Sequence, residues 1–159
     1  QIKFATDNTQ FTWSPGANTF SEITTDLRVT VSAATANKLL MTCSIPVSGG
    51  GTTATWCFGF YNVTAGAWVE PNGLTGSLSG SGANHEVHFA HRGSHQDAND
   101  QDVLSGTLVA DVINSSANIY TIRGQCQTAQ TFYVNHSNAA TSTYSFTGTS
   151  SFIIQEVKV

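Results

Sequence analysis

The chain has 159 residues, a length that suits one domain burying roughly 68–70% of its unfolded surface without a metal or disulfide. Only 10% of the residues are charged and 40% are hydrophobic, which favours an extracellular or particle-borne β protein over a cytosolic enzyme. The net charge of −4, with six scattered Lys and Arg residues, excludes the basic surface that nucleic-acid binding requires. No apolar run is long enough for membrane insertion.

Residues 1–21 are predicted to be an irregular or short-stranded lead-in segment, because scattered aromatic residues surround a turn sequence at residues 14–17. We expect this segment to contact a neighbouring domain or subunit, and residues 22–159 to form the folded domain. The sequence starts without a signal peptide or an initiator Met, which suggests a processed chain or a fragment of a longer protein.

Two amphipathic strands are predicted next, at residues 22–31 and 38–47. In both strands apolar residues occupy alternate positions, the period of a strand with one buried face. The inward positions are Ile23, Leu27, Val29 and Val31 in the first strand, and Leu39, Met41, Cys43 and Ile45 in the second. Pro46 predicts that the second strand ends there or lies at a sheet edge.

A glycine-rich segment at residues 48–53 precedes an aromatic strand at residues 55–63. The glycines lack the following Lys-Ser/Thr of a phosphate-binding loop, so a plain connection between strands is predicted. The strand carries Trp56, Phe58 and Phe60 on one side and Cys57 and Tyr61 on the other, which predicts burial of both faces.

Residues 85–92 (HEVHFAHR) are predicted to form the next strand, and their histidines raise a metal hypothesis, since imidazole and carboxylate groups bind divalent ions. The weak candidates are His85, His88 and His91. Residues three apart on a strand face opposite sides. We therefore expect exposed polar side chains in preference to a single metal site, unless ligands meet on a symmetry axis. No cofactor is expected.

Residues 102–127 contain the clearest hairpin-like unit. Leu104, Leu108, Ala110 and Val112 share one parity, polar residues at 114–117 suit a turn, and residues 119–123 start a second β-branched run. The remaining strands are expected to be added around this pair.

The chain ends with a short strand at residues 131–135, a polar loop at 136–143 and a longer strand at 150–159. The last strand is apolar on both parities at its start, through Phe152, Ile153 and Ile154. A terminal strand with this pattern is expected to have a partner on its outer side. The three cysteines, Cys43, Cys57 and Cys126, are expected to be small core residues; a reduced set suits folding in a cytoplasm, and one pair could bridge in an oxidising setting.

Six segments carry a resemblance to a known family: LRVTVS (27–32), KLLMTCSIPV (38–47), WCFGFY (56–61), LSGTL (104–108), NIYTIR (118–123) and SSFIIQEV (150–157). In this order they resemble the C1q/TNF-like jelly roll of bacteriophage tail-fibre, tailspike and head-decoration proteins. The resemblance covers roughly residues 20–159 and consists of a pattern of strands without a chemical motif.

The resemblance implies an all-β, two-sheet antiparallel jelly-roll sandwich that forms a homotrimer, with Phe152 and Ile154 at the threefold axis. Ile154→Asp is then predicted to dissociate the trimer. It also implies a non-enzymatic virion protein, assembled in the host cytoplasm, whose partners are other virion proteins and a host-surface glycan or protein. The candidate receptor- or glycan-binding residues are Trp68, His91, Arg92 and His95.

Three other functions are weighed. A carbohydrate-binding β-sandwich module would use Trp68 for stacking, although Trp68 can equally pack under a loop. A capsid-decoration protein without a receptor would need no such site. An enzyme is disfavoured because the sequence has no Gly-x-Ser-x-Gly motif and no recognisable pair of catalytic carboxylates.

Overall fold

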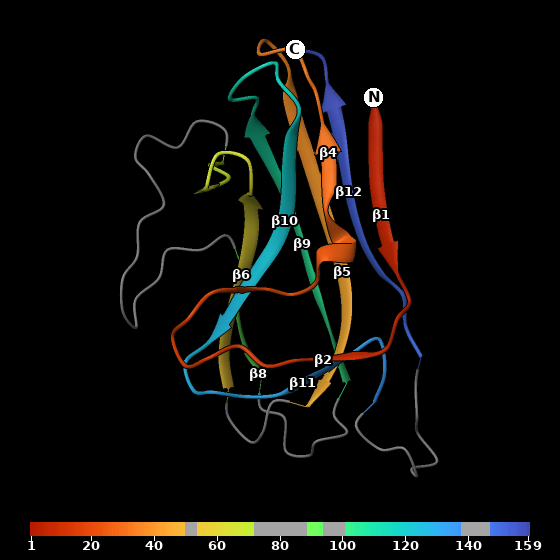
Figure 1. The fold of residues 1–159 in the computed structure, drawn as a ribbon, viewed down its shortest axis with the longest axis vertical. Helices are drawn as coiled ribbons and strands as arrows, with labels where there is room; N and C mark the ends of the chain where they lie inside the picture. Colours follow the sequence, from red (N-terminus) through yellow and green to blue (C-terminus); the bar gives the residue numbers. More distant parts are fainter. Residues whose placement is uncertain (50–53, 72–88, 94–100, 138–146) are drawn as a thin grey trace.

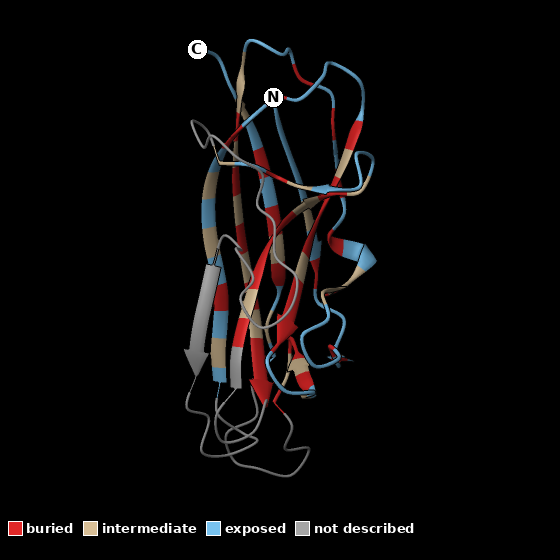
Figure 2. Cartoon of the chain, turned by 90° about the vertical axis from the view of Figure 1, so that its left-hand side faces the viewer, coloured by how far each residue is buried: buried red, intermediate tan, exposed pale blue. Residues whose placement is uncertain are grey.

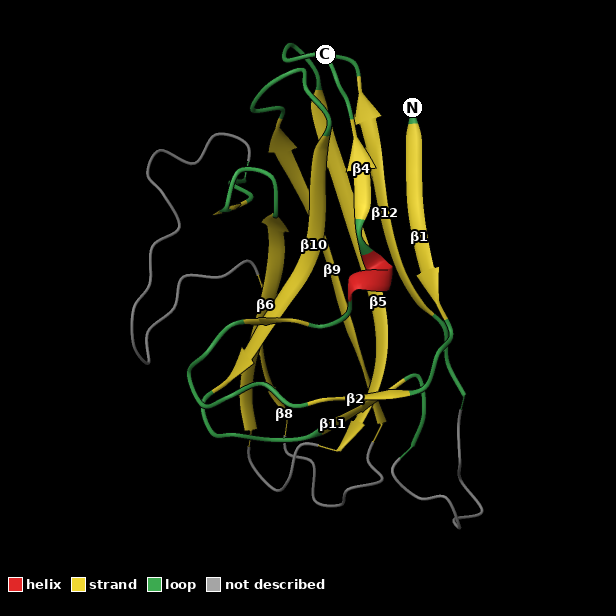
Figure 3. Cartoon of the chain, viewed as in Figure 1, coloured by secondary structure: helices red, strands yellow, loops and turns green. Residues whose placement is uncertain are grey.

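The computed structural model describes residues 1–49, 54–71, 89–93, 101–137 and 147–159, and these form two antiparallel β-sheets packed as a sandwich (Figure 1). Within this part of the chain the only helical element is η1 (Thr25–Leu27), a 3-10 turn drawn as the single red helix in Figure 3. The prediction of an all-β, two-sheet sandwich is confirmed.

The first sheet is built around one long central strand. This strand, β5 (Lys38–Gly49), pairs with β9 (Gln101–Asp111) on one side. On its other side it pairs with β12 (Ser150–Val157) and then β11 (Phe132–Val134). The outermost strands are β1 (Ile2–Asp7), paired with β12, and β2 (Phe11–Trp13), paired with β11.

The second sheet is centred on β10 (Asn118–Cys126) and β6 (Ala54–Asn62). The short strands β3 (Ser21–Glu22) and β4 (Val29–Val31) pair with β10. The short strands β7 (Ala67–Trp68) and β8 (Phe89–Gly93) pair with β6. The chain crosses between the sheets after β5 and again after β9, as in a jelly roll.

This crossing corrects the predicted hairpin at residues 102–127. Both strands exist, but β9 pairs with β5 in the first sheet and β10 pairs with β6 in the second. Residues 114–117 therefore connect the two layers. Alternation in a sequence identifies a strand and its buried face, but it does not identify the partner strand.

The hydrophobic core lies between the sheets and is formed by alternate residues of the long strands, seen as red bands in Figure 2. The expected inward residues Leu39, Met41, Cys43 and Ile45 are at most 1% exposed. Trp56, Phe58 and Phe60 of β6 are buried as well, whereas Cys57 and Tyr61 on its other face are half-buried. The prediction that β6 is buried on both faces is therefore only partly right.

Residues 1–21 pack into the sandwich through short strands, one of the two forms predicted for this segment. They contribute β1 and β2 to the first sheet. Trp13 is buried, stacks on Phe132 with ring centroids 5.2 Å apart, and donates a hydrogen bond to the Ser21 hydroxyl (3.0 Å). Because short strands lack the long alternation that the prediction relied on, their pairing appears only in the tertiary structure.

Two further local predictions differ from the structure. The strand expected at residues 22–31 is divided into β3, η1 and β4, and the Thr24 side chain caps η1 by accepting a hydrogen bond from the Asp26 amide (3.2 Å). The strand expected to end near Pro46 continues to Gly49. Pro46 lies between the segments of β5 that pair with β12 and with β11, and its carbonyl accepts from the Asn135 amide.

Candidate functional site

The side chains that point away from the core of the first sheet form a continuous surface, which we call the outer face of the first sheet. Four neighbouring strands contribute to it, in the order β9, β5, β12 and β1. Its residues are Val103, Ser105, Thr107, Val109, Leu40, Thr42, Ser44, Pro46, Ser151, Ile153, Gln155, Val157, Ile2, Phe4 and Thr6.

This surface exposes large apolar side chains. Phe4 is 69% exposed and Ile2 is 61% exposed, both on β1, and Val103 of β9 is 50% exposed. One cross-strand row runs from Thr107 through Thr42 and Ile153 to Phe4, and the Thr42 and Thr107 hydroxyls lie 3.3 Å apart. The surface thus alternates apolar groups with small hydroxyl groups.

The outer face of the first sheet is almost free of charge. At one end Lys38 and Asp111 face each other across β5 and β9 and form an ion pair. The fifteen residues that define the face contain no ionisable side chain. A partner could therefore cover this surface without the desolvation of an unpaired charge.

The opposite outer face, on the second sheet, carries an ionic cluster. Arg28 donates two hydrogen bonds to the Glu22 carboxylate, from Nε (2.8 Å) and Nη2 (2.6 Å), and the Thr121 hydroxyl donates a third (2.5 Å). Burial alone would raise the pKa of Glu22, but these hydrogen bonds and the charges of Arg28 and Arg123 lower it below its ordinary value. The two outer faces therefore differ in chemistry.

Trp68 belongs to an aromatic cluster on the second sheet. Its ring meets Phe20 edge-on with centroids 4.7 Å apart, and Tyr61 with centroids 5.3 Å apart. The Arg123 guanidinium carbon lies 4.4 Å from the centre of the Tyr61 ring. Trp68 is half-buried, so part of its surface is committed to these contacts.

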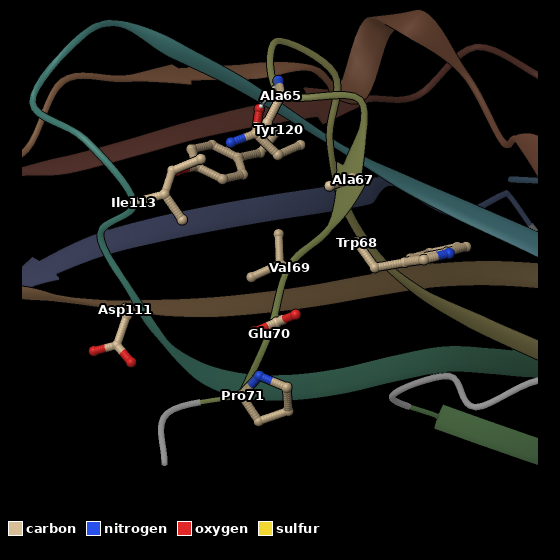
Figure 4. A pocket seen from close by; sticks show the side chains of 10 residues that line it. Ala65, Ala67, Trp68, Val69, Glu70, Pro71, Asp111, Ile113 and Tyr120 are labelled. Carbon is tan, nitrogen blue, oxygen red and sulfur yellow. Dashed lines mark hydrogen bonds between the residues drawn. The ribbon is translucent and has the colours of Figure 1, made fainter. Parts of the chain in front are cut away.

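Beside Trp68 a cavity of about 280 Å³ opens at the side of the sandwich, which we call the side cavity. The chain crosses here from the second sheet to the first, since Trp68 pairs with Tyr61 and Pro71 bridges to Ala110. Figure 4 shows Val69 facing Tyr120 and Ile113, which lies near the end of β9, while the Trp68 ring extends away. Glu70 and Asp111 also line the cavity, and the Asp111 carboxylate forms an ion pair with Lys38.

The predicted interface residues Phe152 and Ile154 are not on an outer surface. Both are fully buried between the sheets, where Phe152 stacks on Phe60. The outward residues of β12 are Ile153, Gln155 and Val157. The sequence is apolar at 152, 153 and 154, so alternation could not assign the inward parity. Ile154→Asp would place a carboxylate in the core of a single chain and would not test assembly.

Most of the histidine candidates lie outside the described residues. This applies to His85, His88 and His95, while His91 and Arg92 lie on β8 at backbone positions that pair with Trp56 and Thr55. The strand predicted at 85–92 is thus observed over its C-terminal part. Among the described residues, no group of three His, Cys, Asp or Glu side chains is close enough to hold a metal ion.

The cysteines are unpaired thiols at three positions in the strands. Burial raises the pKa of Cys43 to about 12, and burial with the nearby Cys57 raises that of Cys126 to about 12. Cys57 is half-buried, and burial raises its pKa as well. Thiols with raised pKa values are poor nucleophiles at neutral pH.

The fold and these surfaces define an all-β sandwich with an apolar outer face on the first sheet and a cavity at its side. No protein-family model matches the sequence, and the comparison with curated proteins finds no match. None of the helical residues that the structure describes forms a helix long and apolar enough to span a bilayer.

Proposed function

We propose that the chain is a non-enzymatic structural protein of a virion, a fibre, knob or capsid-decoration domain that assembles as a homotrimer and attaches the particle to a host surface. The observation that best supports assembly is the outer face of the first sheet. It combines exposed Phe4, Ile2 and Ile153 with hydroxyl groups, and the Lys38 and Asp111 charges at one end form an ion pair.

The exposed apolar groups supply the driving force for assembly. Full burial of one large apolar side chain contributes about 1.5–3 kcal/mol, and Phe4 and Ile2 still have most of that surface exposed. Contiguous apolar patches on monomeric proteins are typically limited to a few hundred Å² and mark interaction sites when larger. Cover by a partner therefore stabilises this face.

The partner we propose is a second copy of the same chain. Closed threefold symmetry turns the same face of each copy toward the axis, and a neutral face can approach the other copies without charge repulsion. Four strands at ~4.8 Å spacing, each about eight residues long, span roughly 19 by 26 Å. That extent is of the same order as the ~800 Å² per partner of a standard interface.

The mass of the purified chain in solution, measured by light scattering after size exclusion, tests this proposal. We expect about three times the 16.8 kDa of one chain. We also expect Ile153→Asp to shift the mass toward the monomer, since it places a carboxylate in the apolar centre of the proposed interface. A monomeric wild-type chain would contradict the proposal and favour the carbohydrate-binding module.

Thr30→Asp is the matched control. Thr30 is exposed on β4, on the outer face of the second sheet, so it receives the same charge on an exposed strand away from the proposed interface. The mass of the Thr30→Asp variant in solution should equal that of the wild type. Circular dichroism of both variants distinguishes dissociation from unfolding. A folded Ile153→Asp variant with unchanged mass would place the interface elsewhere.

A further inference from the structure

We propose that the side cavity binds a single neutral pyranose ring, the terminal sugar of a glycan. The inference deepens the attachment role proposed above and rests on it. It starts from position, because the segment 67–71 that closes the side of the sandwich is fixed at both ends. The Val69 amide donates to the Phe60 carbonyl (3.0 Å), and Pro71 bridges to Ala110.

The size of the cavity suits one sugar ring. Ligand pockets of drug-sized molecules occupy about 300–1,000 Å³, and the side cavity, at about 280 Å³, is just below the lower limit. A ring of six atoms with its hydroxyl groups is a ligand of that scale, whereas a longer oligosaccharide would have to extend into solvent. The cavity therefore fits the end of a glycan.

The lining presents both kinds of group that a pyranose needs. Val69 and Ile113 offer apolar surface to the C–H face of the ring, and Ile113 is 57% exposed at the rim. The Tyr120 side chain is 3% exposed and also lines the cavity, and no described residue forms a hydrogen bond with its hydroxyl. A ligand hydroxyl group that pairs with the Tyr120 hydroxyl would contribute a favourable hydrogen bond.

Charge selects a neutral ligand. Glu70 and Asp111 both line the cavity, so an anion would be repelled. Asp111 is already paired with Lys38, which reduces the net negative charge of the lining. A carboxylate oxygen accepts a hydrogen bond from a sugar hydroxyl group, and the ligand needs no charge of its own for this contact.

Titrations followed by NMR amide shifts test the proposal on the assembled protein. The probes are D-glucose, D-galactose, D-mannose and N-acetyl-D-glucosamine, with N-acetylneuraminic acid as the anionic probe and ethanolamine as the cationic one. We expect at least one neutral sugar to shift the amide signals of the lining residues Val69 and Ile113 in a saturable way, with a millimolar Kd. Saturation by ethanolamine or the acidic sugar alone would overturn the inference.

Two rim variants and one control locate the binding. Glu70→Gln and Ile113→Ser change exposed residues and should each weaken sugar binding by about tenfold. Asp26→Asn removes one charge from the exposed η1 turn and should leave Kd unchanged. Equal affinity in all three variants would show that the sugar binds elsewhere, and no saturation by any neutral sugar would remove the proposal.

Light scattering of the same samples separates this inference from the proposed assembly. A trimer that binds no sugar would keep the assembly and remove the sugar site. A monomer that binds sugar through the rim residues would keep the site and remove the trimer.

Discussion

Phe60 of β6 and Phe152 of β12 stack across the space between the two sheets, with ring centroids 5.2 Å apart and ring planes 11° from parallel. Both side chains are fully buried. Because neighbouring strand residues point to opposite faces, this contact directs Ile153 outward. The orientation of one aromatic ring thus decides which apolar residues of β12 are available to a partner.

Removal of the Phe152 ring should destabilise the fold severely. We expect Phe152→Ala to lower the free energy of unfolding by about 3–5 kcal/mol, the cost of lost burial and a residual cavity. Ile153→Val, at a neighbouring site that is 39% exposed, should cost less than about 1 kcal/mol. Urea unfolding at one protein concentration measures both. Equal losses would contradict the assigned parity of β12.

Gly124 should not tolerate a methyl group. A Cβ atom there would lie 2.8 Å from Trp13 Cη2 and 3.2 Å from the Cys57 carbonyl oxygen. Gly124→Ala is therefore expected to reduce the free energy of unfolding by about 1–3 kcal/mol through overpacking. Gly16→Ala is the control, since the nearest atoms would be 3.5 Å away on Thr19. A stable Gly124→Ala variant would show that the Trp13 indole can move aside.

Asn135 should be needed for its side chain and for its backbone conformation. It is buried with φ 62°. Its side-chain nitrogen Nδ2 donates hydrogen bonds to the backbone carbonyls of Asp7 (2.9 Å) and Thr9 (3.0 Å), and its side-chain oxygen Oδ1 accepts one from the Ser150 hydroxyl (2.7 Å). Asn135→Ala loses these bonds and adds backbone strain, so we expect a loss of about 2–4 kcal/mol in thermal or urea unfolding.

Asn135→Gly separates the two contributions. It loses the same hydrogen bonds but adopts a positive φ without strain, so it should be more stable than Asn135→Ala by about 1 kcal/mol. If alanine were the better replacement, the left-handed backbone at residue 135 would be in doubt.

Acid should weaken the fold partly through Glu22. Its pKa is lower in the folded protein than the ordinary value of 4.5, so its contribution to stability is complete above that value and is lost as the pH falls through the folded-state pKa. We expect Glu22→Gln to lose less stability than the wild type between about pH 6 and about pH 3. Urea unfolding measures the free energy of unfolding of both proteins across this pH range. Parallel pH profiles of the wild type and Glu22→Gln would disprove the contribution of Glu22.

The cysteines should differ in their reaction with a thiol reagent. Cys43 and Cys126 are at most 1% exposed, with pKa values raised to about 12, whereas Cys57 is half-buried. At pH 8 we expect slow modification of Cys57 and protection of the other two until the chain unfolds. Mass spectrometry of peptides after timed labelling measures this order. Early labelling of Cys43 would contradict its burial in β5.

The sequence by itself determined the fold class and the buried face of the long strands. In β5 and β9 most polar residues fall on one parity, although Leu40, Val103 and Val109 share it, so inward positions such as Met41 and Leu104 follow from the two-residue period of a strand. The identity of Trp68 as a surface aromatic could also be proposed from the turns beside it. Its contact with Phe20 could not be predicted from the sequence, because the two residues are far apart in the chain.

Only the tertiary structure decided how the strands pair and which face of β12 is outside. The neighbours β9 and β10 belong to different sheets because hydrogen bonding between strands does not depend on side-chain period. The run Phe152, Ile153 and Ile154 satisfies either parity, and the packing of Phe152 on Phe60 selects one. The side cavity likewise exists only where segment 67–71 meets Ile113 and Tyr120, since a cavity requires surfaces from both sheets.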